Sequence, residues 1–213
     1  MRAARALVFD FNGTLSHDEP VLFAIYSELF AEHGRPLTEA DYYGRLAGNT
    51  EEAIIGGWLG VDGDELRALV KQRIDRYVRR ADGSTIPEHL REAMLLAAGR
   101  VPVGVVSGAY RREIVPVLEG AGLAVHLTTL VAADDVSRGK PDPEGYALAV
   151  EAFGDGVAPQ DVVAFEDTEA GVASALAAGL RCIAVRGTHP DERLAAAERI
   201  VDRIGVGLIR SLV

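Results

Sequence analysis

A short apolar run near the start of the chain ends at an isolated aspartate and is followed at once by a turn. Leu7–Phe9 has the composition of a buried strand, Asp10 follows it, and Asn12 with Gly13 can turn the backbone at little steric cost. A carboxylate at the end of a strand lies where open α/β sheets place their ligand crevice. There it can act as a nucleophile on phosphorus or as a ligand of Mg²⁺. The alternative is an aspartate that only caps the turn.

Strand-like runs alternate with helical patterns over the last two thirds of the chain. Besides Leu7–Phe9, the expected strands are Val101–Val106, Leu127–Val131, Asp161–Phe165, Arg181–Val185 and Arg199–Val201. The expected helices between them are Arg111–Leu118, Pro143–Phe153, Glu169–Ala178 and Asp191–Ala197. This alternation is typical of βαβ units. We therefore predict the α/β class, with a Rossmann-like parallel sheet as core and helices on both of its faces.

The segment after the first strand contains only helical patterns. Its apolar residues recur at helical spacing, and glycines separate one pattern from the next. The expected helices are Val21–His33, Thr38–Leu46, Thr50–Leu59 and Asp64–Arg80. We predict that residues 17–81 form an all-helical cap over the strand-end crevice. Residues 1–16 and 82–213 then form the catalytic core.

The charge balance narrows the classes of partner. The 213 residues include 22 Lys and Arg against 32 Asp and Glu, a net charge of −10, so nucleic acid or an anionic membrane is disfavoured as a partner. Cys182 is the single cysteine, which excludes an intrachain disulfide and a cysteine metal cluster. No apolar stretch approaches the ~18 residues of a membrane span, and no targeting signal is recognisable. We expect a cytoplasmic protein, monomeric or weakly dimeric, that acts on a small molecule.

Four sets of polar residues lie at the ends of predicted strands or in the loops beside them. They are Asp10 with Asn12, Ser107, Lys140, and Glu166 with Asp167. Phosphoryl transfer needs an in-line nucleophile and neutralisation of the equatorial oxygens of phosphorus. Asp10 suits the attack, and Ser107 with Lys140 suits the binding of the transferring oxygens. Asp10 and Asp167 together suit Mg²⁺, which prefers oxygen ligands.

Each of these signals also has a structural alternative. Ser107 could be the N-cap of the helix that begins near Arg111. Lys140 could be a solvated loop cation, and the run Glu166–Thr168 could simply charge and cap the next helix. Capping alone does not readily produce four such signals at the strand ends of one sheet, and their coincidence favours a shared site.

The four segments resemble the four motifs of the haloacid dehalogenase superfamily, in the helical-cap subgroup similar to β-phosphoglucomutase and phosphoglycolate phosphatase. The matching runs are Asp-Phe-Asn-Gly-Thr-Leu, Val-Val-Ser-Gly, Gly-Lys-Pro-Asp-Pro and Phe-Glu-Asp-Thr-Glu-Ala-Gly. The resemblance implies that Asp10 is an aspartyl-phosphate nucleophile and that Ser107 and Lys140 bind the phosphoryl group. It implies Mg²⁺ ligands in Asp10, the backbone carbonyl of Asn12, and Asp167, with Glu166 as a ligand or a neighbouring carboxylate. The expected substrate contacts are Thr14, Arg45, Asn49 and Gly108.

Two positions depart from the pattern of the superfamily. Its phosphatases usually carry a second aspartate, the general acid and base, where this chain has Asn12, and a carboxamide cannot exchange a proton near neutral pH. Its mutases place cations in a cap loop where this chain has Ala47 and Glu51, so a bisphosphorylated intermediate would meet a carboxylate there, which speaks against a sugar-phosphate mutase. The sequence leaves open whether Asn12 is the natural residue or an Asp→Asn change.

We therefore expect a Mg²⁺-dependent phosphatase of a small phosphorylated metabolite, slowed by Asn12. Two alternatives remain open. One is a hydrolase of the dehalogenase or phosphonatase type on the same scaffold. The other is a catalytically degenerate binding protein, which the carboxamide at residue 12 suggests.

Overall fold

The core of the protein is one parallel sheet. The computed structural model describes residues 3–213, so residues 1–2 of the predicted core lie outside the described residues. Its six strands follow the order β3-β2-β1-β4-β5-β6, and every neighbouring pair is parallel. The strands are β1 Ala6–Phe9, β2 Val103–Val106, β3 Thr129–Val131, β4 Val162–Glu166, β5 Arg181–Val185 and β6 Arg199–Val201. The predicted α/β class is confirmed.

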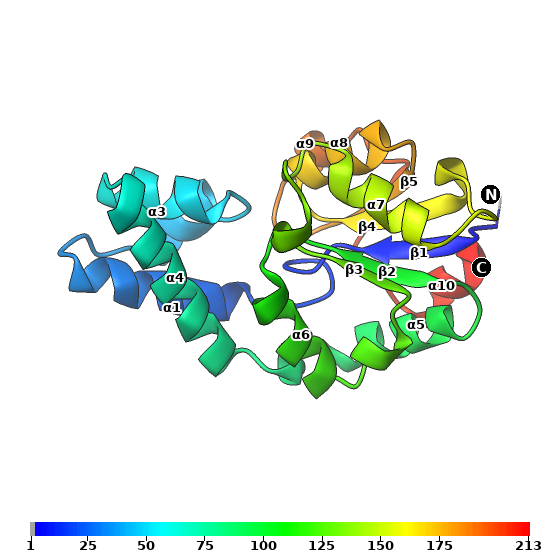
Figure 1. Ribbon diagram of the computed structural model, residues 1–213, viewed down its shortest axis with the longest axis horizontal. Coiled ribbons are helices and arrows are strands. Elements are labelled where there is room, and N and C mark those ends of the chain that lie inside the picture. Colours follow the sequence, from blue (N-terminus) through cyan, green and yellow to red (C-terminus); the bar gives the residue numbers. More distant parts are fainter. Residues whose placement is uncertain (1–2) are drawn as a thin grey trace.

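Helices cover both faces of the sheet (Figure 1). One face carries α5 Glu88–Ala98, α6 Arg111–Gly120 and α10 Val206–Leu212. The other face carries α7 Glu144–Ala152, α8 Glu169–Ala177 and α9 Asp191–Leu194. The side chains of β1 alternate between the two layers, since Leu7 and Phe9 belong to one buried cluster and Ala6 and Val8 to the other.

Several predicted bounds and elements were wrong. The strand expected from Val101 begins only at Val103, after Pro102, which has no N–H to donate to the ladder. Helices α5 and α10 were not predicted at all. The signal for α5 was present, because Leu90, Met94 and Ala97 are buried and lie at helical spacing.

The chain between β1 and α5 forms a group of helices that we call the helical insertion, residues 19–80. It comprises α1 Glu19–Glu32, α2 Glu39–Asp41, a π-helical turn Tyr42–Leu46, α3 Glu51–Leu59 and α4 Gly63–Arg80. The single helix expected over Thr38–Leu46 is therefore divided in two. Helices α1 and α3 both pack on α4, and Figure 1 shows the insertion beyond the end of the sheet toward which β1 points.

The strand order places the ends of β1 and β4 side by side. Phe9 pairs with Phe165, their rings stack with centroids 4.8 Å apart, and the N–H of Asp10 donates to the carbonyl of Phe165. The chain builds the sheet outward from β1 on one side and then crosses to β4 on the other. Ligands of open α/β sheets bind at such a switch point. None of the described helices is long and apolar enough to cross a membrane.

Candidate active site

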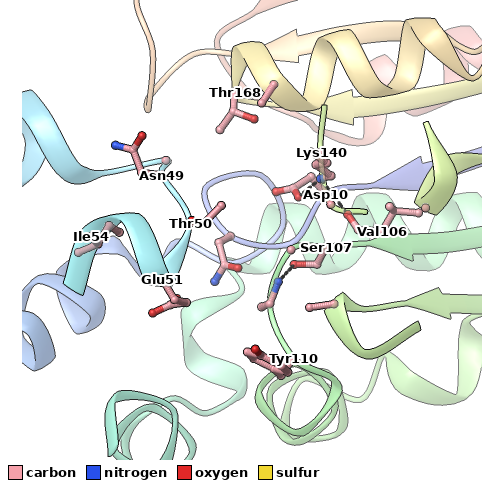
Figure 2. A pocket seen from close by; sticks show the side chains of 18 of the residues that line it. Asp10, Asn49, Thr50, Glu51, Ile54, Val106, Ser107, Tyr110, Lys140 and Thr168 are labelled. Atoms are coloured by element: carbon pink, nitrogen blue, oxygen red, sulfur yellow. Dashed lines mark hydrogen bonds and ion pairs between the residues drawn. The ribbon is translucent and has the colours of Figure 1, made fainter. Parts of the chain in front are cut away.

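A cavity of about 560 Å³ lies between the carboxyl edge of the sheet and the helical insertion. Of the residues predicted from the sequence, Asp10, Asn12, Asn49, Ser107, Gly108, Lys140 and Asp167 line it, whereas Thr14, Arg45 and Glu166 do not. In Figure 2, Asp10, Ser107 and Lys140 lie on the side of the sheet, and Asn49, Thr50 and Glu51 lie across from them on the insertion. The cavity therefore joins segments from both parts of the chain.

Lys140 joins the first and fourth motifs. Its Nζ lies 2.5 Å from Asp10 Oδ1 and 2.5 Å from Glu166 Oε1, and it also donates to the carbonyl of Val106 at 3.1 Å. The ring of Tyr146 lies beside it, with the centroid 5.3 Å from Nζ. Lys140 is thus a paired cation with a side chain only 15% exposed, and the alternative of a solvated loop cation was wrong.

The charge of Lys140 is stabilised by its two carboxylate partners. Burial alone would lower the pKa of the Lys140 ammonium, but Asp10 and Glu166 outweigh that effect and raise it. Lys140 therefore stays charged across the physiological range. Because it binds Asp10 Oδ1, it orients the carboxylate, and no described residue donates a hydrogen bond to Oδ2.

Two threonine hydroxyls orient Asp167. Thr14 Oγ1 donates to Asp167 Oδ1 at 3.0 Å, and Thr188 Oγ1 donates to Oδ2. Thr14 was expected to bind substrate, but its hydroxyl is buried against Asp167, behind the cavity wall. Thr188 was not predicted. The available signal was its place just beyond the end of β5, the strand beside β4.

The Glu166 carboxylate is fully buried and surrounded by donors. Besides Lys140, it accepts from the Tyr146 hydroxyl at 2.7 Å and from the Thr168 hydroxyl at 3.2 Å. The backbone of Gly171 leaves room for it, because a β-carbon there would lie 1.9 Å from Glu166 Cδ. Thr168 is the residue that caps α8, since its Oγ1 accepts from the N–H of Gly171. The capping alternative therefore applies to Thr168, and Asp167 is left for the cavity.

Three carboxylates at this edge fit a divalent cation. Asp10, Glu166 and Asp167 each offer one oxygen, and these atoms all lie within 4.8 Å of one another. Burial raises the pKa of Asp10 well above its usual value and that of Asp167 to about 7. A bound cation would favour the ionised forms that burial disfavours, and an oxygen-only donor set is the kind that Mg²⁺ prefers.

Ser107 continues the edge of the site at the end of β2. Its N–H donates to the carbonyl of Val131, and its Oγ accepts from the N–H of Ala109 at 3.0 Å. Helix α6 begins only after Tyr110, whose N–H donates to Glu113. The alternative that Ser107 is the N-cap of α6 was therefore wrong.

The two substrate contacts predicted on the insertion, Asn49 and Arg45, differ in whether they line the cavity. Asn49 lines the cavity, and its Nδ2 donates to the carbonyls of Arg45 and Leu46. Arg45 lies outside the cavity, with its side chain 68% exposed and 3.5 Å from Asp41 Oδ1. Its guanidinium also lies over the ring of Trp58. Arg45 is thus an exposed residue near the end of the π-helical turn.

A buried ion-pair network forms part of the insertion side. Arg73 of α4 pairs with Glu51 at 2.7 Å and with Glu113 of α6, and Glu51 also accepts from the Tyr26 hydroxyl at 2.5 Å. Burial raises the pKa of Glu51 to about 7, although Arg73 acts in the opposite direction. The carboxylates of Glu51 and Glu113 thus offset the single positive charge of Arg73. The insertion side of the cavity therefore offers little attraction to a second phosphate.

Comparisons with known proteins match the chain to one family. The profile of a hydrolase family described as haloacid dehalogenase-like hydrolase matches residues 4–179. The chain is 34% identical to validoxylamine A 7'-phosphate phosphatase of Streptomyces hygroscopicus over 91% of each chain. It is 32% identical to N-acetylmuramic acid 6-phosphate phosphatase of Pseudomonas aeruginosa, over 93% of this chain and 90% of that one. The fold matches CbbY of Rhodobacter sphaeroides with a TM-score of 0.81 at 22% identity, over 94% and 95% of the two chains.

Proposed function

Because the chain belongs to the haloacid dehalogenase-like hydrolases, we propose that it is a Mg²⁺-dependent phosphatase that forms an aspartyl-phosphate on Asp10. The observation that carries this proposal is the contact of Lys140 with both Asp10 and Glu166 at the end of the sheet where Asp167 also lies. This arrangement joins a nucleophile, a fixed cation and a candidate metal site in one cavity.

The reaction proceeds in two displacements. A carboxylate oxygen of Asp10 attacks phosphorus, and the bond from phosphorus to the ester oxygen breaks as the alcohol leaves. Water then attacks the phosphorus of the aspartyl-phosphate, which releases inorganic phosphate and returns the Asp10 carboxylate. Lys140 and Ser107 would bind the transferring oxygens, and Lys140 also fixes the orientation of Asp10.

The metal would be held by Asp10, Asp167 and the backbone carbonyl of Asn12, with Glu166 close by. When bound, Mg²⁺ supplies positive charge that offsets the phosphoryl oxygens and the carboxylates. The threonines at residues 14 and 188 keep both oxygens of Asp167 oriented. Their role is therefore to hold the metal ligand in place.

We expect Asn12 to limit the rate at which the alcohol leaves. Its carboxamide neither gives nor takes a proton near neutral pH, so the leaving alcohol departs without a general acid from this position. We expect efficient turnover of esters with acidic alcohols and slow turnover of alkyl phosphates.

The substrate that we propose is a small phosphorylated metabolite. The two similar phosphatases are named for phosphorylated small molecules, and the cavity of about 560 Å³ has a size suited to one. The dehalogenase and binding-protein alternatives explain the site less well. Neither requires three buried carboxylates beside a lysine.

The test is hydrolysis of p-nitrophenyl phosphate with Mg²⁺ or with EDTA, by the wild type and by Asp10→Asn. The proposal requires metal-dependent turnover that the variant loses. Mg²⁺ with beryllofluoride should in addition give an adduct on Asp10. Halide release from haloacids without phosphate release would establish the dehalogenase alternative, and no turnover of either substrate would favour a binding protein.

A further inference from the structure

The side chain of Asn12 is tied to a buried carboxylate that the reaction does not use. Its Nδ2 donates to Asp18 Oδ2 at 2.7 Å, and the Tyr77 hydroxyl donates to the same oxygen. Asp18 and Tyr77 are both buried, with exposed fractions of 0% and 1%. Asp18 directly precedes α1, and Tyr77 belongs to α4. The contact therefore connects the first motif to the helical insertion.

This contact fixes which end of the carboxamide faces the cavity. An ionised carboxylate accepts hydrogen bonds and donates none, so Asp18 selects the NH₂ end of Asn12. The Asn12 oxygen then points away from Asp18, and no described residue donates to it. Because Asn12 lines the cavity whereas Asp18 does not, that oxygen is the end available to a ligand.

The same contact explains why residue 12 is an amide. An aspartate at residue 12 would place two carboxylate oxygens about as close as the present 2.7 Å between Nδ2 and Oδ2. Tyr77 would still donate to Asp18 Oδ2, but the other oxygen, Oδ1, is buried without a hydrogen-bond partner among the described residues, so that repulsion would be offset only in part. Asn12 and Asp18 are therefore a matched pair.

We propose that Asp18 is a positioning residue, which together with Tyr77 holds the Asn12 carboxamide so that its oxygen accepts a hydrogen bond from the water that attacks the aspartyl-phosphate. This inference rests on the proposed function. Asn12 orients the water but takes no proton from it, because an amide oxygen is a poor base; the proton of the attacking water passes to a phosphoryl oxygen, and the phosphate leaves with it.

A double-mutant cycle on thermal stability tests the matched pair without any use of activity. It compares the wild type, Asn12→Asp, Asp18→Asn and the double variant in metal-free buffer near pH 8. Asn12→Asp alone should lower the Tm by roughly 3 °C or more, because it adds a second carboxylate against Asp18. The same change in the Asp18→Asn background should lower the Tm clearly less. An equal loss of Tm in the two backgrounds would overturn the proposed pairing of Asn12 with Asp18.

Kinetics with p-nitrophenyl phosphate test the positioning role. Asp18→Leu removes the acceptor, frees the Asn12 amide to rotate, and should lower kcat by roughly tenfold to a hundredfold with little change in KM. Asp18→Asn keeps an acceptor oxygen for Nδ2 and should retain kcat to within about threefold. The matched control is Asp64→Asn, because Asp64 is an exposed residue of α4 and lies outside the cavity.

The possible outcomes separate this inference from the proposed function. If both substitutions of Asp18 lower kcat equally, or if KM changes and kcat does not, Asp18 does not position Asn12. If the wild type itself turns over no phosphate ester, the proposed function fails. The stability cycle still decides in that case whether Asn12 and Asp18 form a matched pair.

Discussion

The backbone of Gly13 lies directly against the carboxylate of Asp167. A β-carbon at residue 13 would fall 2.1 Å from Asp167 Oδ2, and the φ of Gly13 is +78°, a conformation that favours glycine. Gly13→Ala should therefore displace Asp167, remove the stabilisation of the protein by Mg²⁺, and lower the free energy of unfolding by more than about 1 kcal/mol. Thermal unfolding with and without Mg²⁺ measures both effects.

The matched control for that substitution is Gly57→Ala in α3. A β-carbon at Gly57 meets no atom within 4 Å, and the residue is helical, so alanine should stabilise the protein slightly. A Gly13→Ala protein that keeps the full Mg²⁺ shift would show that the approach of Gly13 to Asp167 does not matter for the metal.

Lys140→Met should lower kcat by roughly a hundredfold or more, because it removes the fixed cation beside the nucleophile. The substitution also leaves the carboxylates of Asp10 and Glu166 without their shared partner. Steady-state kinetics at saturating Mg²⁺ measure the loss. Lys140→Arg should lose activity as well, since the space beside the Tyr146 ring holds a compact ammonium and not a planar guanidinium. A variant with near wild-type kcat would exclude Lys140 from phosphoryl binding.

The stabilisation by Mg²⁺ should increase from about pH 6 to about pH 8. Burial holds the pKa of Asp167 at about 7, so below this pH the metal must displace a proton, and above it the ligand is already ionised. Thermal shifts at the two pH values measure the difference. Asp167→Asn should remove most of the shift at both. A shift in wild type that falls as the pH rises would contradict the assignment.

Asp18→Asn should change the pH dependence of stability. Burial raises the pKa of Asp18 to about 6, so between about pH 4 and pH 6 the folded protein holds a proton that the unfolded chain has lost. The contribution of Asp18 to stability therefore falls as the pH rises through this window, by on the order of 2 to 3 kcal/mol. Urea unfolding of the two proteins at both ends of the window, compared as a difference, should show Asp18→Asn gaining relative stability toward higher pH.

Asn12→Asp should accelerate an alkyl phosphate more than p-nitrophenyl phosphate. A new general acid helps most where the leaving alcohol is weakly acidic, and such groups typically contribute about 10²- to 10⁴-fold. The gain should be larger in the Asp18→Asn background, where the new carboxylate no longer meets Asp18. Ratios of kcat/KM for the two substrates measure the effect, and equal responses would mean that residue 12 is not the position of the proton donor.

The parallel core and the convergence of the four motifs were predictable because both depend on local patterns. Each apolar run ended at a polar residue, and parallel strands bring their carboxyl ends to one edge. The structure accordingly places Asp10, Ser107, Lys140 and Asp167 around one cavity. The chemical roles of these residues, the cap bounds at residues 17 and 81, the oligomeric state and the cellular location stay predictions.

The side chains that orient the site carboxylates were not predicted, because they come from distant segments and, apart from the place of Thr188 just beyond a strand end, carry little signal in the sequence. Thr188 reaches Asp167 from the loop after β5, and Tyr146 reaches Glu166 from α7. Their side chains follow no periodic pattern that would mark them. Gly171 belonged to a recognised motif, but only the packed structure shows that it leaves space for the Glu166 carboxylate.

The ion pair of Arg73 with Glu113 has a consequence for how the helical insertion can move. It links α4 to α6, and the two helices also pack on each other. A second ion pair between them joins the guanidinium of Arg112 to Asp75 Oδ1 at 2.9 Å. To move α4 away from α6, the protein would have to separate the buried carboxylate of Glu113 from Arg73, which is costly. The insertion is therefore joined to the core at α6 by charge as well as by packing. We expect any widening of the cavity entrance on this side to begin with the loss of these two ion pairs.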